Sequence, residues 1–478
     1  MKDIYNISKI GFCAICICCA SLSTLYSCKD DFPVNVESDK ITVLKSIKIV
    51  NAGKAGNEII EGVVNEASKT VSFPRIDPET DLSAIKFEAG TSDGAILEQD
   101  TYAIPFKEGE SESTVVIKIT NSPRYREYLV KIRLKIPVYG ADFTKSAVYD
   151  YTNNELGNPI YETFTGAFTR GTGFDGEHVL IVSRHAAGSH LLKVSDLKKN
   201  VINRIPLNMT GVALGTFTVN VGDIVNGHTY IANLSGASAA SPIKIYHWTD
   251  PSVPPQTVAN IDVSKITGAG VRHGDNMSVN LDKNGNGYIF LGDNAGTKVL
   301  RLKVSNYKTV GDPFVISAAV NVGSWSSFNQ IGETDDYLFT GHDAPIMAVN
   351  SGGSVSYTLS RTAIPVRSSD SRVVEFNGER YLLTTTAART GSEPTALSLY
   401  NITKGNNIVD ALTAFEQSDR KPIYDYPLLG PVNTSPATQT GWSVLKDEAG
   451  KDKSLLIYTA ASDAGFVIVE VPKKELED

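Results

Sequence analysis

The chain has 478 residues and a formal net charge of −8 at pH 7. No segment concentrates lysine and arginine, which argues against a nucleic-acid partner because phosphate binding needs clustered positive charge. Glycine (39) and proline (21) are frequent and methionine (4) is scarce, a composition that favours strands and turns over helices.

The first 28 residues have the layout of a lipoprotein export signal. Lys2 and Lys9 form a short positive region, and an apolar stretch follows that is too short and too weakly apolar for a stable transmembrane helix. Residues 25–28 read Leu-Tyr-Ser-Cys, a pattern that lipoprotein signal peptidase cleaves. We therefore expect residues 1–27 to be a signal peptide and Cys28 to be lipidated. An ordinary secretory signal with an incidental cysteine is the alternative.

The cysteine distribution agrees with this expectation. All five cysteines lie at or before position 28, so the exported chain would have no disulfide and would depend on packing for its stability. The Cys-x-x-Cys spacing at residues 13 and 16 falls inside the segment to be removed and is set aside.

A charged segment follows the lipidated residue. Lys29, Asp30 and Asp31 resemble the surface-export signal of Bacteroides-type lipoproteins. The resemblance implies an outer-membrane protein that faces the cell exterior and is held by membrane lipid through acylated Cys28. Residues 32–40 lack a long apolar pattern, so residues 28–40 are expected to form a lipid-anchored tether.

Residues 41–137 are expected to form a small β-sandwich. In the segment 128–136, Tyr128, Val130 and Ile132 alternate with Lys131 and Arg133, the period of two of a strand with one buried face. Strands every 10 to 20 residues suggest an immunoglobulin-like sandwich. The ending resembles the Ig-like modules found after such lipid anchors, for which a spacer role is expected.

Residues 138–478 carry an internal repeat that predicts a β-propeller. A first recurring strand and a second one after it appear six times, each preceded by a turn rich in Asn, Asp and Gly. The first strand is expected at 178–183, 230–234, 288–292, 337–341, 381–385 and 455–459, and the second at 191–194, 243–246, 299–302, 346–349, 397–400 and 466–469. The fold class is therefore all-β, with an Ig-like sandwich followed by a propeller of six blades.

Two segments bear on how the ring closes. Alternation at 147–152 offers an outer strand for the last blade, which would close the ring. The long insert 415–440 leaves room for a seventh blade. The repeat loosely resembles six-bladed lactonase and NHL-type propellers, but too few of their residues are present to transfer a site.

Ligands of propellers often bind on the face that carries the loops before the inner strands and the loops between the second and third strands. Indole rings there could stack on sugars, while Arg and His could hold acidic groups. Structural roles in the channel or between blades are the alternative for each residue. The ligand-binding candidates placed on this face are Trp325, Trp442, Arg272, His273, Arg184, His185, His342 and Asp343.

One weak metal motif is present. Asp282, Asn284, Asn286 and a later Asp293 match a calcium-loop pattern, although the segment coincides with a repeat turn and a plain hairpin is the favoured interpretation. The sequence contains no zinc-protease motif, nucleophile elbow or phosphate-binding loop, and we expect no cofactor.

Three functions remain open. The first is a non-catalytic surface protein that binds polysaccharide for an uptake system, with an outer-membrane transporter complex as a further partner. This rests on layout and fold-level analogy. The second is a propeller-type lyase, using His273, His185 and Arg272, or a glycoside hydrolase with paired carboxylates such as Asp275 and Asp343. The third is a protein-interaction scaffold of the cell envelope.

Overall fold

The computed structural model describes residues 39–107, 110–136, 138–152, 161–213, 217–236, 238–269, 271–365, 367–391 and 394–476. Contacts divide this part of the chain into two compact units that meet in sequence at Ile136 and Pro137. The expected signal peptide and Cys28 lie outside the described residues. Among the residues described, no helix is long and apolar enough to cross a membrane.

The first unit is one sheet of eight strands, hydrogen-bonded in the order β5-β7-β8-β3-β2-β1-β4-β6. The period of two in β8 is confirmed, since Tyr128, Val130 and Ile132 are fully buried. The strands are β1 (Leu44–Ala52), β2 (Glu58–Asn65), β3 (Thr70–Ser72), β4 (Ile85–Thr91), β5 (Ile96–Leu97), β6 (Thr101–Tyr102), β7 (Glu112–Asn121) and β8 (Arg124–Arg133).

The structure does not show the two separate sheets of the expected Ig-like sandwich. The short strand β3 pairs antiparallel with β2 and parallel with β8, with Val71 opposite Val130, and so joins the two halves into one ladder. A single core lies within this sheet, because Ile47 of β1, Phe87 of β4 and Ile117 of β7 all pack together. A parallel bridge between distant strands leaves no local pattern in the sequence.

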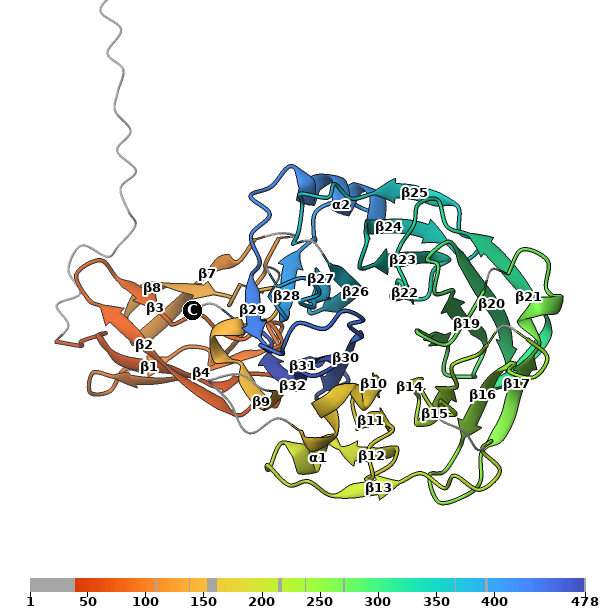
Figure 1. The fold of residues 1–478 in the computed structure, drawn as a ribbon. Coiled ribbons are helices and arrows are strands. Elements are labelled where there is room, and N and C mark those ends of the chain that lie inside the picture. The colour runs from red at the N-terminus through yellow and green to blue at the C-terminus, as the bar shows by residue number, and fades with distance from the viewer. Residues whose placement is uncertain are drawn as a thin grey trace, which may run out of the picture. The chain divides into compact units, whose positions relative to one another are not determined.

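The second unit is a six-bladed β-propeller, which confirms the predicted blade count (Figure 1). Each blade is a four-stranded antiparallel sheet, and the recurring strands are the second and third of each blade. The first five blades are β10 (Thr169–Phe174), β11 (His178–Ser183), β12 (His190–Lys193), β13 (Arg204–Pro206); β14 (Val221–Val225), β15 (His228–Ala232), β16 (Ile243–Trp248), β17 (Gln256–Ile261); β18 (Ser278–Leu281), β19 (Gly287–Gly292), β20 (Lys298–Ser305), β21 (Lys308–Ser317); β22 (Ser326–Gln330), β23 (Asp336–Gly341), β24 (Ala344–Asn350), β25 (Val355–Thr358); and β26 (Ser368–Phe376), β27 (Glu379–Thr386), β28 (Ala396–Asn401), β29 (Tyr424–Pro427).

The sixth blade closes the ring with a strand from the other end of the unit. It consists of β30 (Thr438–Lys446), β31 (Asp452–Ala461), β32 (Gly465–Pro472) and β9 (Ala147–Thr152), with Gly465 opposite Thr152 and Glu470 opposite Ala147. The expectation that residues 147–152 close the ring is confirmed. The long insert holds no seventh blade, because its described residues form the end of α2 (Ile408–Glu416), the outer strand β29 and the entry to β30.

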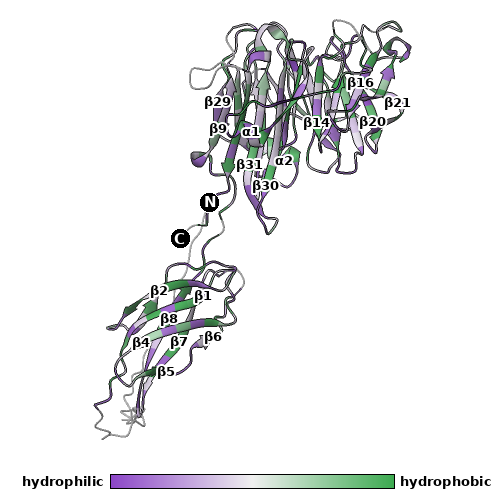
Figure 2. Ribbon diagram, turned by 90° about the horizontal axis from the view of Figure 1, so that it is seen from below, coloured by the Kyte–Doolittle hydropathy of each residue, from purple (hydrophilic) through white to green (hydrophobic). Residues whose placement is uncertain are grey.

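Short helical turns complete the unit. They are η1 (Phe143–Lys145), η2 (Glu162–Ala167), α1 (Val194–Leu197) and η3 (Val263–Lys265). Hydrophobic residues are frequent along the strands (Figure 2), and the second strands of the blades, such as β11 with buried Val179, Leu180 and Ile181, are near-continuous apolar runs because both faces of a blade are covered. Tyr230, Tyr381 and Tyr458 of the second strands are fully buried between blades.

The predicted Asn-Gly hairpins lie at the turns between first and second strands. Asn226 and Gly227 have φ values of 51° and 76°, and Asn377 and Gly378 have 45° and 76°. Two consecutive left-handed residues are typical of type I′ turns, which match the twist of the strands they join.

Candidate ligand-binding face

The strands of each blade alternate in direction, so two sets of loops share one side of the ring. These are the loops that precede the inner strands (β10, β14, β18, β22, β26, β30) and the loops between second and third strands. We call this side the loop face. The Asn-Gly hairpins lie on the opposite side.

Trp325 is on a loop that precedes an inner strand, but it points inward. It is only 3% exposed and packs with Val221, Val279 and Ala437, which belong to three other blades. Its indole Nε1 donates a hydrogen bond to the Thr438 carbonyl oxygen at 3.0 Å. The predicted loop position of Trp325 is therefore right, but the side chain fills the centre of the propeller and exposes no indole face for stacking on a sugar.

Trp442 also departs from its expected position. It lies within β30, opposite Ile457 of β31, rather than in the loop before the strand. It is half-buried and packs against the core shared by the fifth and sixth blades, near Val444 and Leu455. The reason is that β30 already begins at Thr438, so Trp442 lies four residues inside the strand and away from the loop face.

An exposed combination of arginine and aromatic side chains lies instead on the first two blades. The guanidinium of Arg184 lies 5.0 Å from the ring centre of Phe217, and the ring of His185 packs edge-on against Phe168 at 5.7 Å. Phe168 and Phe217 are each 43% exposed. With Arg170, we call these residues the Arg184 patch.

Arg170 and Arg184 bind backbone atoms rather than carboxylates. Arg170 Nη1 donates to the Ser435 carbonyl oxygen at 2.7 Å, and Arg184 Nη2 donates to the Ala167 carbonyl oxygen at 2.9 Å. Within the described part of the chain, neither forms an ion pair. Burial lowers the pKa of both side chains, so each guanidinium bears a desolvation cost that an anionic ligand would offset.

Further charges gather around Arg170. Asp275 and Asp463 raise its pKa, whereas Arg184 and Arg272 lower it, so all four lie within electrostatic reach. Arg272 is held by Asp275 through two hydrogen bonds of 3.0 Å. Three arginines thus face two aspartates, which leaves an excess positive charge.

His273, between Arg272 and Asp275 in sequence, is not accessible. It is fully buried, and its Nδ1 lies 3.1 Å from the Val271 carbonyl oxygen. Burial lowers its pKa and keeps the ring neutral. A general base must reach the substrate, so the fold does not present His273 for the role considered for it.

A second polar cluster joins the fourth and fifth blades. Asp343 accepts hydrogen bonds from Arg389 Nη1 to both carboxylate oxygens at 3.0 Å, and one from Arg367 Nη1 at 3.1 Å. Burial opposes ionisation of Asp343, but the hydrogen bond from Arg389 and the nearby positive charges outweigh it and lower the pKa. His342 is 1% exposed, and burial lowers its pKa to about 4.

The loop before β30 connects the two clusters. Arg389 Nε donates to the Thr434 carbonyl oxygen at 3.2 Å, and Arg170 donates to the neighbouring Ser435. Asn433 of the same loop donates to Asp463 at 2.8 Å. Seven of the eight predicted residues, all except Trp442, lie in loops of the loop face. Of these, Arg184, His185 and Arg272 are accessible and lie in or beside the Arg184 patch.

The calcium-loop candidate is a hairpin. The Asp282 carboxylate accepts hydrogen bonds from the backbone N–H groups of Asn284 and Asn286 at 2.8 Å. Asp293 follows the far end of the six-residue strand β19, roughly 20 Å away at about 3.3 Å per residue. These residues cannot coordinate one ion. Within the described residues, no group of three or more His, Cys, Asp or Glu side chains could hold a metal.

The sequence of this chain matches one family model over residues 30–474, that of a domain of unknown function, DUF4623. The chain belongs to the DUF4623 family. A crystal structure of a DUF4623 family protein from Bacteroides eggerthii is 41% identical, with a TM-score of 0.70, and the match covers 91% of this chain and 100% of that one. A search of curated proteins finds no match.

Two other solved structures are similar to this DUF4623 chain at a lower level. An endo-arabinase from Bacteroides thetaiotaomicron is 14% identical with a TM-score of 0.31, covering 66% of this chain and 97% of that one. The WD40 β-propeller domain of Doa1 is 10% identical with a TM-score of 0.34, covering 76% and 89%. Both likenesses are too weak to carry an argument about function.

Phe168, Phe217 and Arg170 were missed by sequence reasoning. The repeat itself contained the signal, because Phe168 and Phe217 stand one and four residues before the inner strands β10 and β14. The two tryptophans predicted for this face, Trp325 and Trp442, are instead buried and half-buried.

Proposed function

We propose that this DUF4623 protein is a cell-surface lipoprotein that binds anionic saccharides on its loop face without converting them. The observation that carries the proposal is the Arg184 patch. There, the guanidinium groups of Arg170 and Arg184 lack carboxylate partners among the described residues and stand beside the exposed rings of Phe168 and Phe217.

The chemistry of the patch suits an acidic sugar. A guanidinium matches a carboxylate with two parallel hydrogen bonds, and an aromatic ring offers a flat apolar surface to the C–H face of a pyranose. Arg184 lies over Phe217, so both kinds of contact are available within one sugar residue.

The cellular setting rests on the sequence. Lipidation at Cys28 and the acidic residues after it support anchoring in the outer membrane with the chain facing outward. We include in the proposal a spacer role for the N-terminal unit and a role beside an outer-membrane transporter complex in polysaccharide uptake.

Catalysis is less well supported than binding. Asp275 and Asp343, considered as a hydrolase pair, are each held by arginine side chains, and His273 is buried. The arginines beside Asp343 lower its pKa, so its carboxylate is unsuited to the role of general acid in a glycosidase.

A protein partner is the second candidate. Val271, Val320, Leu429 and Val432 lie in loops before inner strands and are 43–51% exposed. Aliphatic side chains suit a protein interface better than a sugar, and arginine and aromatic residues are enriched in such interfaces.

Calorimetry on the soluble chain from residue 29 onward would test the saccharide proposal. The panel pairs uronic-acid polymers, such as polygalacturonate and alginate, with neutral dextran. We expect saturable binding of an acidic polymer that Arg184→Ala and Phe217→Ala each weaken about tenfold, with no new reducing ends or unsaturated products.

Arg301→Ala is the matched control, because Arg301 also lies over aromatic rings, Tyr288 and Phe314, but on the third blade away from the patch. Equal loss of binding in Arg301→Ala and Arg184→Ala would remove the patch from the proposal. Product formation would establish an enzyme.

A further inference from the structure

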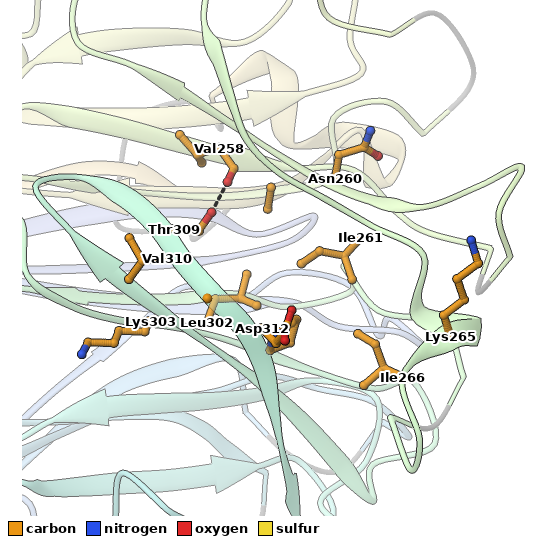
Figure 3. A pocket seen from close by; sticks show the side chains of 13 residues that line it. Val258, Asn260, Ile261, Lys265, Ile266, Leu302, Lys303, Thr309, Val310 and Asp312 are labelled. Atoms are coloured by element: carbon orange, nitrogen blue, oxygen red, sulfur yellow. Dashed lines mark hydrogen bonds between the residues drawn. The ribbon is translucent and has the colours of Figure 1, made fainter.

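A groove with a volume of about 620 Å³ lies at the rim of the ring, between the outer strands of the second and third blades (Figure 3). Strand β17 forms one wall, and β21 with the neighbouring β20 forms the other. Outer strands of a sheet have one edge without a hydrogen-bonded neighbour, which is where an additional strand can bind.

A bulge in β21 opens the groove. Arg301 stands opposite Phe314 and Lys303 opposite Val310, so residues 311–313 of β21 face Leu302 alone. Extra residues of this kind bend a strand, and Gly311 allows the bend with a φ of 70°. Pro313 within the bulge has no N–H, so the β21 edge lacks a hydrogen-bond donor at that position.

The edge of β17 is open to a partner. Lys244 of β16 stands opposite Asn260, but its backbone N–H and carbonyl oxygen both bond to Asn233, at 2.7 and 3.2 Å. In an antiparallel pair of strands, two opposite residues direct their backbone groups either toward each other or both away. Because Lys244 directs its groups to Asn233, Asn260 must direct its own away from β16. The backbone of exposed Asn260 therefore points into the groove.

The same edge already accepts one hydrogen bond from across the groove. The Thr309 hydroxyl donates to the Val258 carbonyl oxygen, as the dashed line in Figure 3 shows. This contact joins the two walls at one end of the groove. Beyond it, the Asn260 edge is the next position at which a strand could pair.

The lining combines an apolar floor with a charged rim. Ile261, Ile266 and buried Leu302 supply the floor, and exposed Lys265 and Lys303 stand at the rim with Asp312. Lysine and proline can also protect an edge strand against unwanted pairing. An edge strand that is only protected from pairing needs no apolar hollow beside it, whereas a bound peptide needs one to bury its apolar side chains.

We propose that this groove binds an extended segment of a partner polypeptide. The segment pairs with the Asn260 edge of β17, places alternate apolar side chains on the floor, and directs acidic side chains to Lys265 and Lys303. The site is separate from the Arg184 patch, so it does not depend on the saccharide proposal.

Fluorescence anisotropy on the soluble chain from residue 29 onward tests the proposal. The probe is a labelled octapeptide of alternating valine and glutamate with blocked ends. One matched peptide has the amides of one edge N-methylated, and another has lysine in place of glutamate. We expect saturable binding of the first probe and at least about tenfold weaker binding of the other two.

Variants of the protein locate the binding. In the double variant Lys265→Glu and Lys303→Glu, the preference between the glutamate and lysine peptides should reverse. Both lysine side chains are exposed, including Lys265 in its 3.5 Å ion pair with Asp262. Asn260→Pro removes the free N–H and should weaken both peptides. Lys453→Glu, an exposed lysine of the sixth blade, and Arg184→Ala should leave binding unchanged.

Equal binding of the N-methylated peptide, an unchanged preference in the double variant, or no saturable binding by the parent chain would each overturn the proposal. Self-association of the parent chain that the double variant abolishes would assign the groove to a second copy instead. Thermal unfolding of each variant confirms that it is folded, and the double variant remains decisive if Asn260→Pro does not fold.

Discussion

The indole N–H of Trp325 reaches the carbonyl oxygen of Thr438 at 3.0 Å, which ties the fourth blade to the sixth across the centre of the ring. The two residues are 113 positions apart in sequence. Like the hydrogen bond from Gln439 of β30 to the Gly222 carbonyl oxygen of β14, this bond joins blades that are not neighbours in the ring.

Replacing Trp325 should therefore destabilise the whole ring. We expect Trp325→Ala to lower the free energy of unfolding by about 3–5 kcal/mol, because a large buried side chain is removed and the Thr438 carbonyl loses its donor. Urea denaturation followed by tryptophan fluorescence and circular dichroism measures this. Trp442→Ala is the comparison and should cost less, since Trp442 is half-buried. Equal losses would show that Trp325 has no special role at the centre.

Asp223 should make stability fall as pH rises. It lies on the inner strand β14, and burial raises its pKa to about 6, against the effect of Arg372 nearby. Between about pH 4 and 6 the folded chain holds a proton that the unfolded chain releases, so this stability is complete below pH 4 and lost above pH 6.

Asp223→Asn should remove that loss. Relative to the parent, the variant should gain about 2 kcal/mol between pH 4.5 and 7.5. Unfolding by urea at both pH values measures the change, and the exposed Asp335→Asn serves as control. A difference between parent and Asp223→Asn that does not vary with pH would contradict the prediction.

His247 should make the stability of the folded chain fall as pH decreases. It is 3% exposed, stacks on Tyr230 at 4.5 Å, and its Nε2 lies 2.8 Å from His228 Nδ1. Burial, with a contribution from His228, lowers its pKa to about 4. The folded chain therefore keeps the ring neutral, and stability present above about pH 6.5 is lost as pH falls towards 4.

His247→Gln should flatten the acid side of the stability curve. The parent should lose up to about 3 kcal/mol more than the variant between pH 7 and 4.5. NMR titration of the histidine Cε1 protons gives a direct check, because His247 should titrate well below pH 6.5, the ordinary value for histidine. A normal titration of His247 would show that the ring is solvated.

Calcium should have no effect on the hairpin at Asp282. Its carboxylate is already engaged by the N–H groups of Asn284 and Asn286, and Asp293 lies at the other end of β19. We expect the melting temperature to be the same in millimolar calcium and in chelator. Asp282→Ala should lower it by a few degrees, because the turn loses two hydrogen bonds. Stabilisation by calcium that Asp282→Ala abolishes would restore the metal site.

The propeller, its six blades and the closure of the ring by residues 147–152 could all be predicted from the amino-acid sequence. These features follow from local rules: strand periodicity, Asn-Gly turns and the recurrence of both along the chain. The same mapping also placed Arg184, His185 and Arg272 on the loop face. The period of two in β8 predicted which of its side chains are buried, because alternation along a strand is also a local rule.

Which side chains remain accessible could be seen only in the folded chain. Trp325 is buried because the inner strands of other blades converge on it, and Trp442 is covered because β30 starts four residues earlier. The parallel bridge from β3 to β8 likewise joins segments about 60 residues apart and turns the expected sandwich into one sheet. Burial and long-range pairing depend on neighbours that are distant in sequence, and a local pattern contains no record of them.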